Sequence, residues 1–235
     1  MKVEIWSDVM CPFCYIGKRR FENALQQFDQ KNEISIIWKS YQLDPSMKTE
    51  PGKNINQYLA ERKGWTLEYA RQMNAHVTSM AKEVGLHYDF DKAIVANSFD
   101  AHRFSHLAAK HGQGNEAEEL LFKAYFTEGK NIADHDTLIQ LGIEIGIDAT
   151  VTKQMLFTDA YTYEVQHDIN EAEALSLRGV PFFVMNRKFG VSGAQPEEVI
   201  LNTLQKSFDD WQQEQQQLEL AVTEGGVCKP GGECD

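Results

Sequence analysis

The sequence predicts an α/β protein whose sheet is assembled from both ends of the chain, with a large helical insertion between them. Two observations predict this class. Strand, helix and strand patterns fill roughly the first 40 residues, and two further strands and a helix follow only near residue 180. Between these ends, from about residue 55 to residue 177, strand patterns are almost absent and helical spacing dominates.

The N-terminal segment predicts a βαβ unit. Val3–Trp6 is typical of a short strand, and apolar residues at helical spacing follow from Ile16 to Phe28. The apolar-rich run Ile34–Trp38 is typical of a buried strand. Two strands joined by a helix usually pair in parallel, so we expect a parallel pair here.

The middle of the chain predicts a series of helices separated by glycines. Glycine readily adopts the left-handed backbone conformation that ends a helix. The expected helices span about residues 55–62, 66–84, 92–111, 115–128, 135–145 and 151–177, with Gly64, Gly85, Gly112, Gly129 and Gly146 among them.

The C-terminal part predicts a hairpin followed by a long helix. Val180–Met185 and Lys188–Val191 are the expected strands, and a helix with proline and acids in its first turn runs to about Leu220. Together, these elements predict an α/β thioredoxin-like fold with an all-helical insertion. We expect a discontinuous thioredoxin-like domain at 1–45 and 165–220, a helical insertion domain at 46–164 and a tail at 221–235.

Composition excludes several classes of protein. The 235 residues are 42% hydrophobic and 25% charged, as in ordinary globular domains, and no apolar run approaches a membrane span. A net charge of −12 disfavours binding to nucleic acid. No secretory signal is visible, so we expect a cytoplasmic protein. Its 4 cysteines are then reactive or metal-binding thiols rather than a disulfide scaffold.

The strongest functional signal is the motif Cys11-Pro12-Phe13-Cys14 at the start of the first helix. Two cysteines at this spacing can close a small disulfide, and a helix N-terminus favours the reactive thiolate form of the first one. The alternative is half of a zinc site, completed by Cys228 and Cys234. Those two are separated by five residues, wider than the usual two to four, so redox chemistry is favoured.

Four segments carry a resemblance to a known family: Ser7–Gly17, Asn97–Arg103, Arg178–Val184 and Ser192–Pro196. In this order they make essentially the whole chain resemble the DsbA-like thioredoxin-fold proteins. Among these proteins, the chain resembles the cytoplasmic FrnE-like dithiol–disulfide oxidoreductases.

The resemblance implies a thiol–disulfide oxidoreductase or isomerase that works through a mixed disulfide on Cys11, which Cys14 resolves. It also implies a cis Val180–Pro181 bond packed against the thiols, although base rates alone favour trans. We expect protein or small-molecule disulfides and thiols as partners, with no cofactor, no metal, no nucleic acid and no membrane. The expected substrate-binding residues are Val180, Pro181, Phe13, Pro12 and His102.

Two other functions remain open from the sequence. Glutathione-dependent transferases or isomerases of the kappa-class or hydroxychromene-carboxylate isomerase type share the fold and resemble the chain around Asn97 and Val180–Pro181. They typically carry serine where Cys11 stands, and they lack a resolving thiol such as Cys14. A zinc-binding chaperone or interaction module would instead use the cysteines as ligands.

Three further features allow alternative interpretations. His102 and His106 share a helix face and are either packing residues or polar groups facing the thiols. Asp8 is either a turn residue or a group that influences the thiols. Cys228 and Cys234 flank a Lys-Pro-Gly-Gly turn that lets them approach each other, as a second redox pair, as metal ligands or as incidental residues.

Overall fold

The computed structural model describes the backbone of residues 1–220 and the side chains of residues 1–216, and the expected pair Cys228–Cys234 lies outside them. The main sheet has the strand order β2-β1-β5-β6, in which β1 pairs in parallel with β2 and antiparallel with β5, and β5 pairs antiparallel with β6. A sheet assembled from both ends of the chain is therefore confirmed. Its strands are β1 (Lys2–Ser7), β2 (Ser35–Ser40), β5 (Phe182–Met185) and β6 (Phe189–Ser192).

The two faces of the main sheet are covered by different helices. Val3 and Ile5 of β1 share an apolar cluster with residues of α1 (Pro12–Gln26) and α9 (Glu197–Leu220). Trp6 points to the opposite face, because side chains alternate along a strand. There it packs with Ala172 of α8 (Thr162–Ala174).

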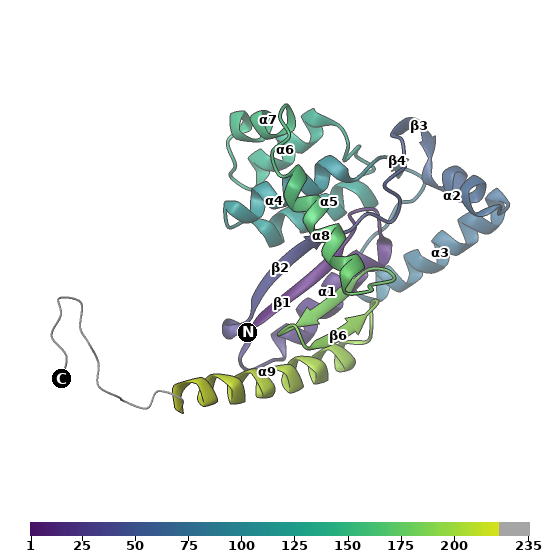
Figure 1. Ribbon diagram of the computed structural model, residues 1–235. Helices are drawn as coiled ribbons and strands as arrows, with labels where there is room; N and C mark the ends of the chain where they lie inside the picture. Colours follow the sequence, from purple (N-terminus) through teal and green to yellow (C-terminus); the bar gives the residue numbers. More distant parts are fainter. Residues whose placement is uncertain (221–235) are drawn as a thin grey trace.

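The chain between β2 and β5 is mostly helical. Figure 1 shows α4 to α7 grouped beyond one end of the main sheet, whereas α2 and α3 extend to the side. None of the helices described here is both long enough and apolar enough to cross a membrane. The remaining elements are a 3₁₀ turn (Lys31–Glu33), β3 (Glu50–Asn54), α2 (Ile55–Lys63), α3 (Leu67–Glu83), β4 (Ile94–Val95), α4 (Phe99–Lys110), α5 (Gly114–Phe126), α6 (His135–Glu144), α7 (Ala149–Leu156) and α8 (Thr162–Ala174).

The prediction of one helix over residues 92–111 is wrong at its start. Residues Ile94–Val95 form β4, which pairs with β3 in a second, two-stranded sheet, and helix α4 begins only at Phe99. The side chain of Asn54 donates hydrogen bonds to the carbonyls of Phe90, Asp91 and Ala93. These carbonyls therefore have a distant partner in place of helical N–H groups.

The expected helical segment 151–177 is two helices, α7 and α8. The guanidinium of Arg103, on α4, donates to the carbonyl oxygens of Met155, Thr158 and Ala160. A charged donor that satisfies the last carbonyls of a helix stabilises its end. The break between α7 and α8 is thus set by a residue more than 50 positions earlier in the chain.

Candidate active site

The cysteine motif opens α1 directly after β1, as the sequence predicts. Cys11 precedes the first helical turn with extended backbone angles (φ −88°, ψ 111°), and Pro12 occupies the first turn. The N–H of Cys11 donates to the carbonyl of Asp8, and the N–H of Cys14 donates to the carbonyl of Cys11, both at 2.9 Å. Because the first N–H groups of a helix lack helical acceptors, Cys11 lies at the positive end of the helix dipole.

Both thiols are free and buried. Cys11 is 3% exposed and Cys14 is 1% exposed, so both sulfurs are buried in the resting protein and Cys14 is the more buried of the two. The reason is packing, since both cysteines belong to one apolar cluster with Tyr88 and Val180. Burial raises the pKa of the Cys14 thiol well above its usual value, and the adjacent Cys11 thiol raises it further. Cys14 is therefore a neutral thiol that must lose its proton before it can react.

The loop before β5 lies against Cys11. The Val180–Pro181 peptide bond is cis, and the Cys11 thiol donates to the carbonyl oxygen of Val180 at an Sγ–O distance of 3.5 Å. Cys11 is buried in this contact, whereas Val180 is only partly buried. The ring of Pro181 packs on α1 at Gly17, where a Cβ atom would lie 2.7 Å from Pro181 Cγ. A glycine is needed at this position because the loop approaches the helix so closely.

Two of the five expected substrate-binding residues belong to the motif itself, and the structure brings two more to it. Pro12 and Phe13 follow Cys11 in the chain, and Val180 and Pro181 face it. Phe13 is 38% exposed and offers an apolar surface beside the thiols. The hydroxyl of Tyr88 donates to the carbonyl oxygen of Pro12 at 2.7 Å. Tyr88 was not predicted, because nothing local in the sequence relates it to a residue 76 positions away.

The structure does not support contact between His102 and a substrate. His102 is 2% exposed, and its Nε2 lies 3.5 Å from Oδ1 of Asp8. Asp8 is also buried and accepts hydrogen bonds from the N–H groups of Met10 and Leu43. The packing interpretation of His102 and the turn interpretation of Asp8 therefore describe these residues best. Both residues support the segment behind the cysteines.

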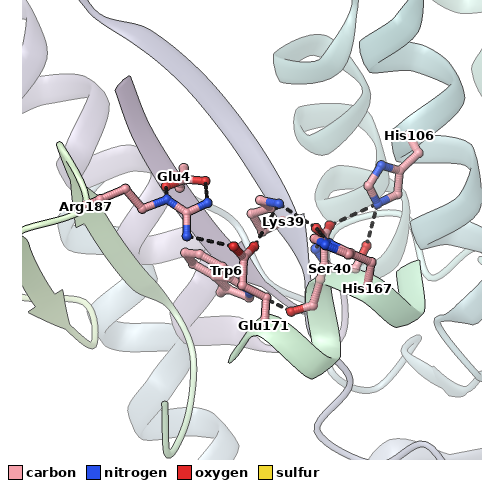
Figure 2. A network of polar contacts seen from close by, with 9 residues as sticks. Glu4, Trp6, Lys39, Ser40, His106, His167, Glu171 and Arg187 are labelled. Atoms are coloured by element: carbon pink, nitrogen blue, oxygen red, sulfur yellow. Dashed lines mark hydrogen bonds and ion pairs between the residues drawn. The ribbon is translucent and has the colours of Figure 1, made fainter. Parts of the chain in front are cut away.

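His106 contacts Ser40 and Asp168 and belongs to a network of charged groups that the sequence did not predict. Figure 2 shows the network, in which Lys39 lies between acidic groups of α8. Nζ of Lys39 is 2.7 Å from Oδ1 of Asp168 and 3.0 Å from Oε2 of Glu171, and Arg187 links Glu171 to Glu4. Burial alone would raise the pKa of Asp168, but hydrogen bonds from His106, Lys39 and the Ser40 amide outweigh it and lower that pKa.

Two catalytic interpretations of this network fail on geometry. His167, Asp168 and Glu171 lie close enough together to hold a metal ion, but the Lys39 ammonium already occupies the position between the two carboxylates. Oγ of Ser40 and Oδ2 of Asp168 each lie 3.1 Å from Nε2 of His106, so both contact the same ring nitrogen. A Ser-His-Asp triad needs the two opposite ring nitrogens, so His106 cannot relay a proton between these groups.

A thioredoxin-like sheet with a Cys-x-x-Cys pair at a helix start, facing a cis-proline loop, defines the thioredoxin-fold class of thiol proteins. The DSBA-like thioredoxin domain family matches residues 2–205, and the chain belongs to this family. A probable DsbA oxidoreductase from Streptomyces coelicolor is 32% identical, with 100% of this chain and 98% of that chain covered and a TM-score of 0.86. The Bacillus subtilis (strain 168) protein YwbO is 28% identical over 185 residues, covering 78% of this chain and 86% of YwbO.

More distant solved structures share the fold alone. The cytosolic disulfide reductase DsbM from Pseudomonas aeruginosa, solved with GSH, is 15% identical, with 92% of this chain and 100% of that chain covered and a TM-score of 0.61. A 2-hydroxychromene-2-carboxylate isomerase is 14% identical, with 93% and 99% covered and a TM-score of 0.63. These structures show that one fold carries both disulfide chemistry and isomerisation, so function has to be argued from the site.

Proposed function

We propose that the protein is a thiol–disulfide oxidoreductase or isomerase in which Cys11 is the nucleophile and Cys14 the resolving thiol. The observation that carries the proposal is the position of Cys11, at the start of α1 and 3.5 Å from the Val180 carbonyl. The helix dipole stabilises a negative charge on this sulfur. A substrate disulfide approaches Cys11 from the side of Val180, which is only partly buried.

The reaction proceeds in two exchanges. The Cys11 thiolate attacks one sulfur of a substrate disulfide, and the other substrate sulfur leaves as a thiolate. Cys14 then attacks the Cys11 sulfur, so that the substrate leaves reduced and the protein carries a Cys11–Cys14 disulfide. The same steps in reverse oxidise a dithiol substrate. An extended substrate segment pairs with the backbone of Val180 by strand addition while its side chains contact Phe13.

A trapping experiment tests the proposal. The Cys14→Ser variant, incubated with a peptide disulfide, should accumulate a mixed disulfide on Cys11 that peptide mass mapping locates. Cys11→Ser is the matched control and should trap nothing. A Cys14→Ser protein that forms no adduct, or forms it equally with Cys11→Ser, contradicts the assignment.

Insulin reduction separates the proposal from glutathione-dependent transfer or isomerisation. Reduction should require both cysteines, whereas conjugation or isomerisation should not require Cys14. The zinc-binding alternative would complete its ligand set with Cys228 and Cys234, which lie outside the described residues. Stoichiometric zinc on the reduced protein, without thiol exchange, would favour it. The FrnE-like subclass and the cytoplasmic location stay predictions.

A further inference from the structure

The hydroxyl of Ser7 is a buried polar group behind the cysteine motif that the reaction has not used so far. Ser7 is the last residue of β1 and is 2% exposed. Its Oγ makes no hydrogen bond of good geometry with any described group. Buried hydroxyls in folded proteins are almost always paired, so an unpaired one next to reactive groups requires an explanation.

The geometry of β1 and α1 directs this hydroxyl toward Cys14. Val3 and Ile5 share an apolar cluster with Phe21 of α1, and Ser7 is the next residue on the same side of the strand. Cys14 precedes Phe21 by seven residues, which is two helical turns, so it lies on the same face of α1. Ser7 therefore faces the first turn of the helix, where Cys14 is buried.

The surroundings of the Cys14 sulfur agree with this direction. The Ser7 hydroxyl and the backbone N–H of Asp8 are the two groups that hold down the pKa of Cys14 against the effect of burial. In the described structure Cys14 is a neutral thiol, which is a weak hydrogen-bond acceptor. A thiolate is an anion and accepts much stronger hydrogen bonds from the same donors.

We propose that Ser7 is a catalytic residue of the resolving step, in which its hydroxyl donates a hydrogen bond to the Cys14 thiolate. This inference rests on the proposed function. The hydroxyl has no partner in the resting dithiol and gains one when Cys14 ionises. An interaction that forms only in the reacting state lowers the barrier to that state.

The step balances without an outside oxidant. The Cys14 sulfur, having lost its proton, attacks the Cys11 sulfur of the mixed disulfide. A Cys11–Cys14 bond forms, the bond between Cys11 and the substrate sulfur breaks, and its electron pair leaves with the substrate sulfur. The substrate thiolate then takes up the proton that Cys14 lost.

A rapid acid-quench experiment on the full chain tests this role, with a peptide disulfide as the substrate and mass mapping of the adduct on Cys11. The Ser7→Ala variant should form the adduct at the wild-type rate but clear it about tenfold more slowly, as expected for one lost hydrogen bond to a charged group. The midpoint of the pH dependence of this resolution rate should also rise. Ser7→Thr keeps the hydroxyl and should clear the adduct faster than Ser7→Ala.

Ser40→Ala is the matched control. Ser40 is the register partner of Ser7 on β2 and is equally buried, but its hydroxyl contacts His106 rather than a sulfur. This variant should clear the adduct as fast as wild type. Because the Ser7 hydroxyl is unpaired in the resting protein, Ser7→Ala should fold and be at least as stable as wild type.

The outcomes are distinct. A Ser7→Ala protein with an unchanged midpoint pH and clearing rate overturns the role of Ser7, whatever its stability. Equal slowing in Ser7→Ala and Ser40→Ala would also overturn it, because the effect would then come from the sheet. If Cys14→Ser forms no adduct on Cys11, the proposed function itself fails.

Discussion

Replacing Gly17 by alanine should move the Val180–Pro181 loop away from Cys11. Gly17 lies inside α1, where alanine by itself favours the helix by about 1 kcal/mol. The added Cβ would lie 2.7 Å from Cγ of Pro181, well below the normal carbon–carbon contact of about 3.5–4.0 Å. The proline ring must therefore shift by about 1 Å.

The two effects on stability oppose each other. Overpacking of this kind costs about 1–3 kcal/mol, which exceeds the helix-propensity gain. We expect Gly17→Ala to lower the free energy of unfolding by about 1 kcal/mol, measured by urea denaturation. The effect on exchange should be larger, because a shift of about 1 Å in a positioning group can slow a reaction by about 100-fold. The insulin-reduction rate measures this effect.

Gly179→Ala is the control for this prediction. Gly179 lies in the same loop, but a Cβ atom there has open space around it. The thiol–disulfide exchange rate of Gly179→Ala should match that of wild type. A Gly17→Ala protein that is more stable than wild type and exchanges equally fast would refute the reasoning, because the ring of Pro181 would then not limit the space at Gly17.

Three further predictions concern buried polar contacts. Lys39→Met leaves the carboxylates of Asp168 and Glu171 without their ammonium partner and should lower the free energy of unfolding by about 3 kcal/mol in urea denaturation. The pKa of Asp168 is lower in the folded state, so its stabilising effect is present above the unfolded value of about 3.8 and is lost as pH falls through the folded pKa. Thermal unfolding between about pH 5 and pH 2 should therefore show a steeper loss of stability for wild type than for Asp168→Asn. Tyr88→Phe removes the hydrogen bond to the Pro12 carbonyl and should lower stability by about 1 kcal/mol in urea denaturation.

Matched variants check these expectations. Lys92→Met removes an exposed lysine whose carboxylate partner, Asp89, is also exposed, and it should change stability little. Equal losses for Lys39→Met and Lys92→Met would contradict the role of the buried pair. If the stability of wild type and of Asp168→Asn falls equally with decreasing pH, the Asp168 carboxylate does not contribute to acid unfolding. Tyr125→Phe also removes a hydroxyl bonded to a backbone carbonyl, that of Ile94, and should lower the free energy of unfolding by a similar amount.

Local features of the sequence determined the part of the site that lies within one stretch of chain. The strand Val3–Trp6, the cysteine motif and the helix after it were predicted correctly, because side-chain periodicity and helix-start chemistry depend on near neighbours. The position of the Val180–Pro181 segment beside the thiols was expected only from family resemblance. Periodicity carries no information about which distant loop packs on a helix.

Only the tertiary structure decided the remaining features. Arg103 binds the Met155 carbonyl in the last turn of α7 and two carbonyls just after it. Asn54 supports the segment that leads into β4, where a helix was expected. Tyr88 reaches Pro12 across 76 residues, and Asp168 gathers donors from β2 and α4. In each case a polar group is satisfied by a partner far away in the chain. Such pairs form because folding buries both groups together and a buried polar group must find a partner, a requirement that sequence spacing does not reveal.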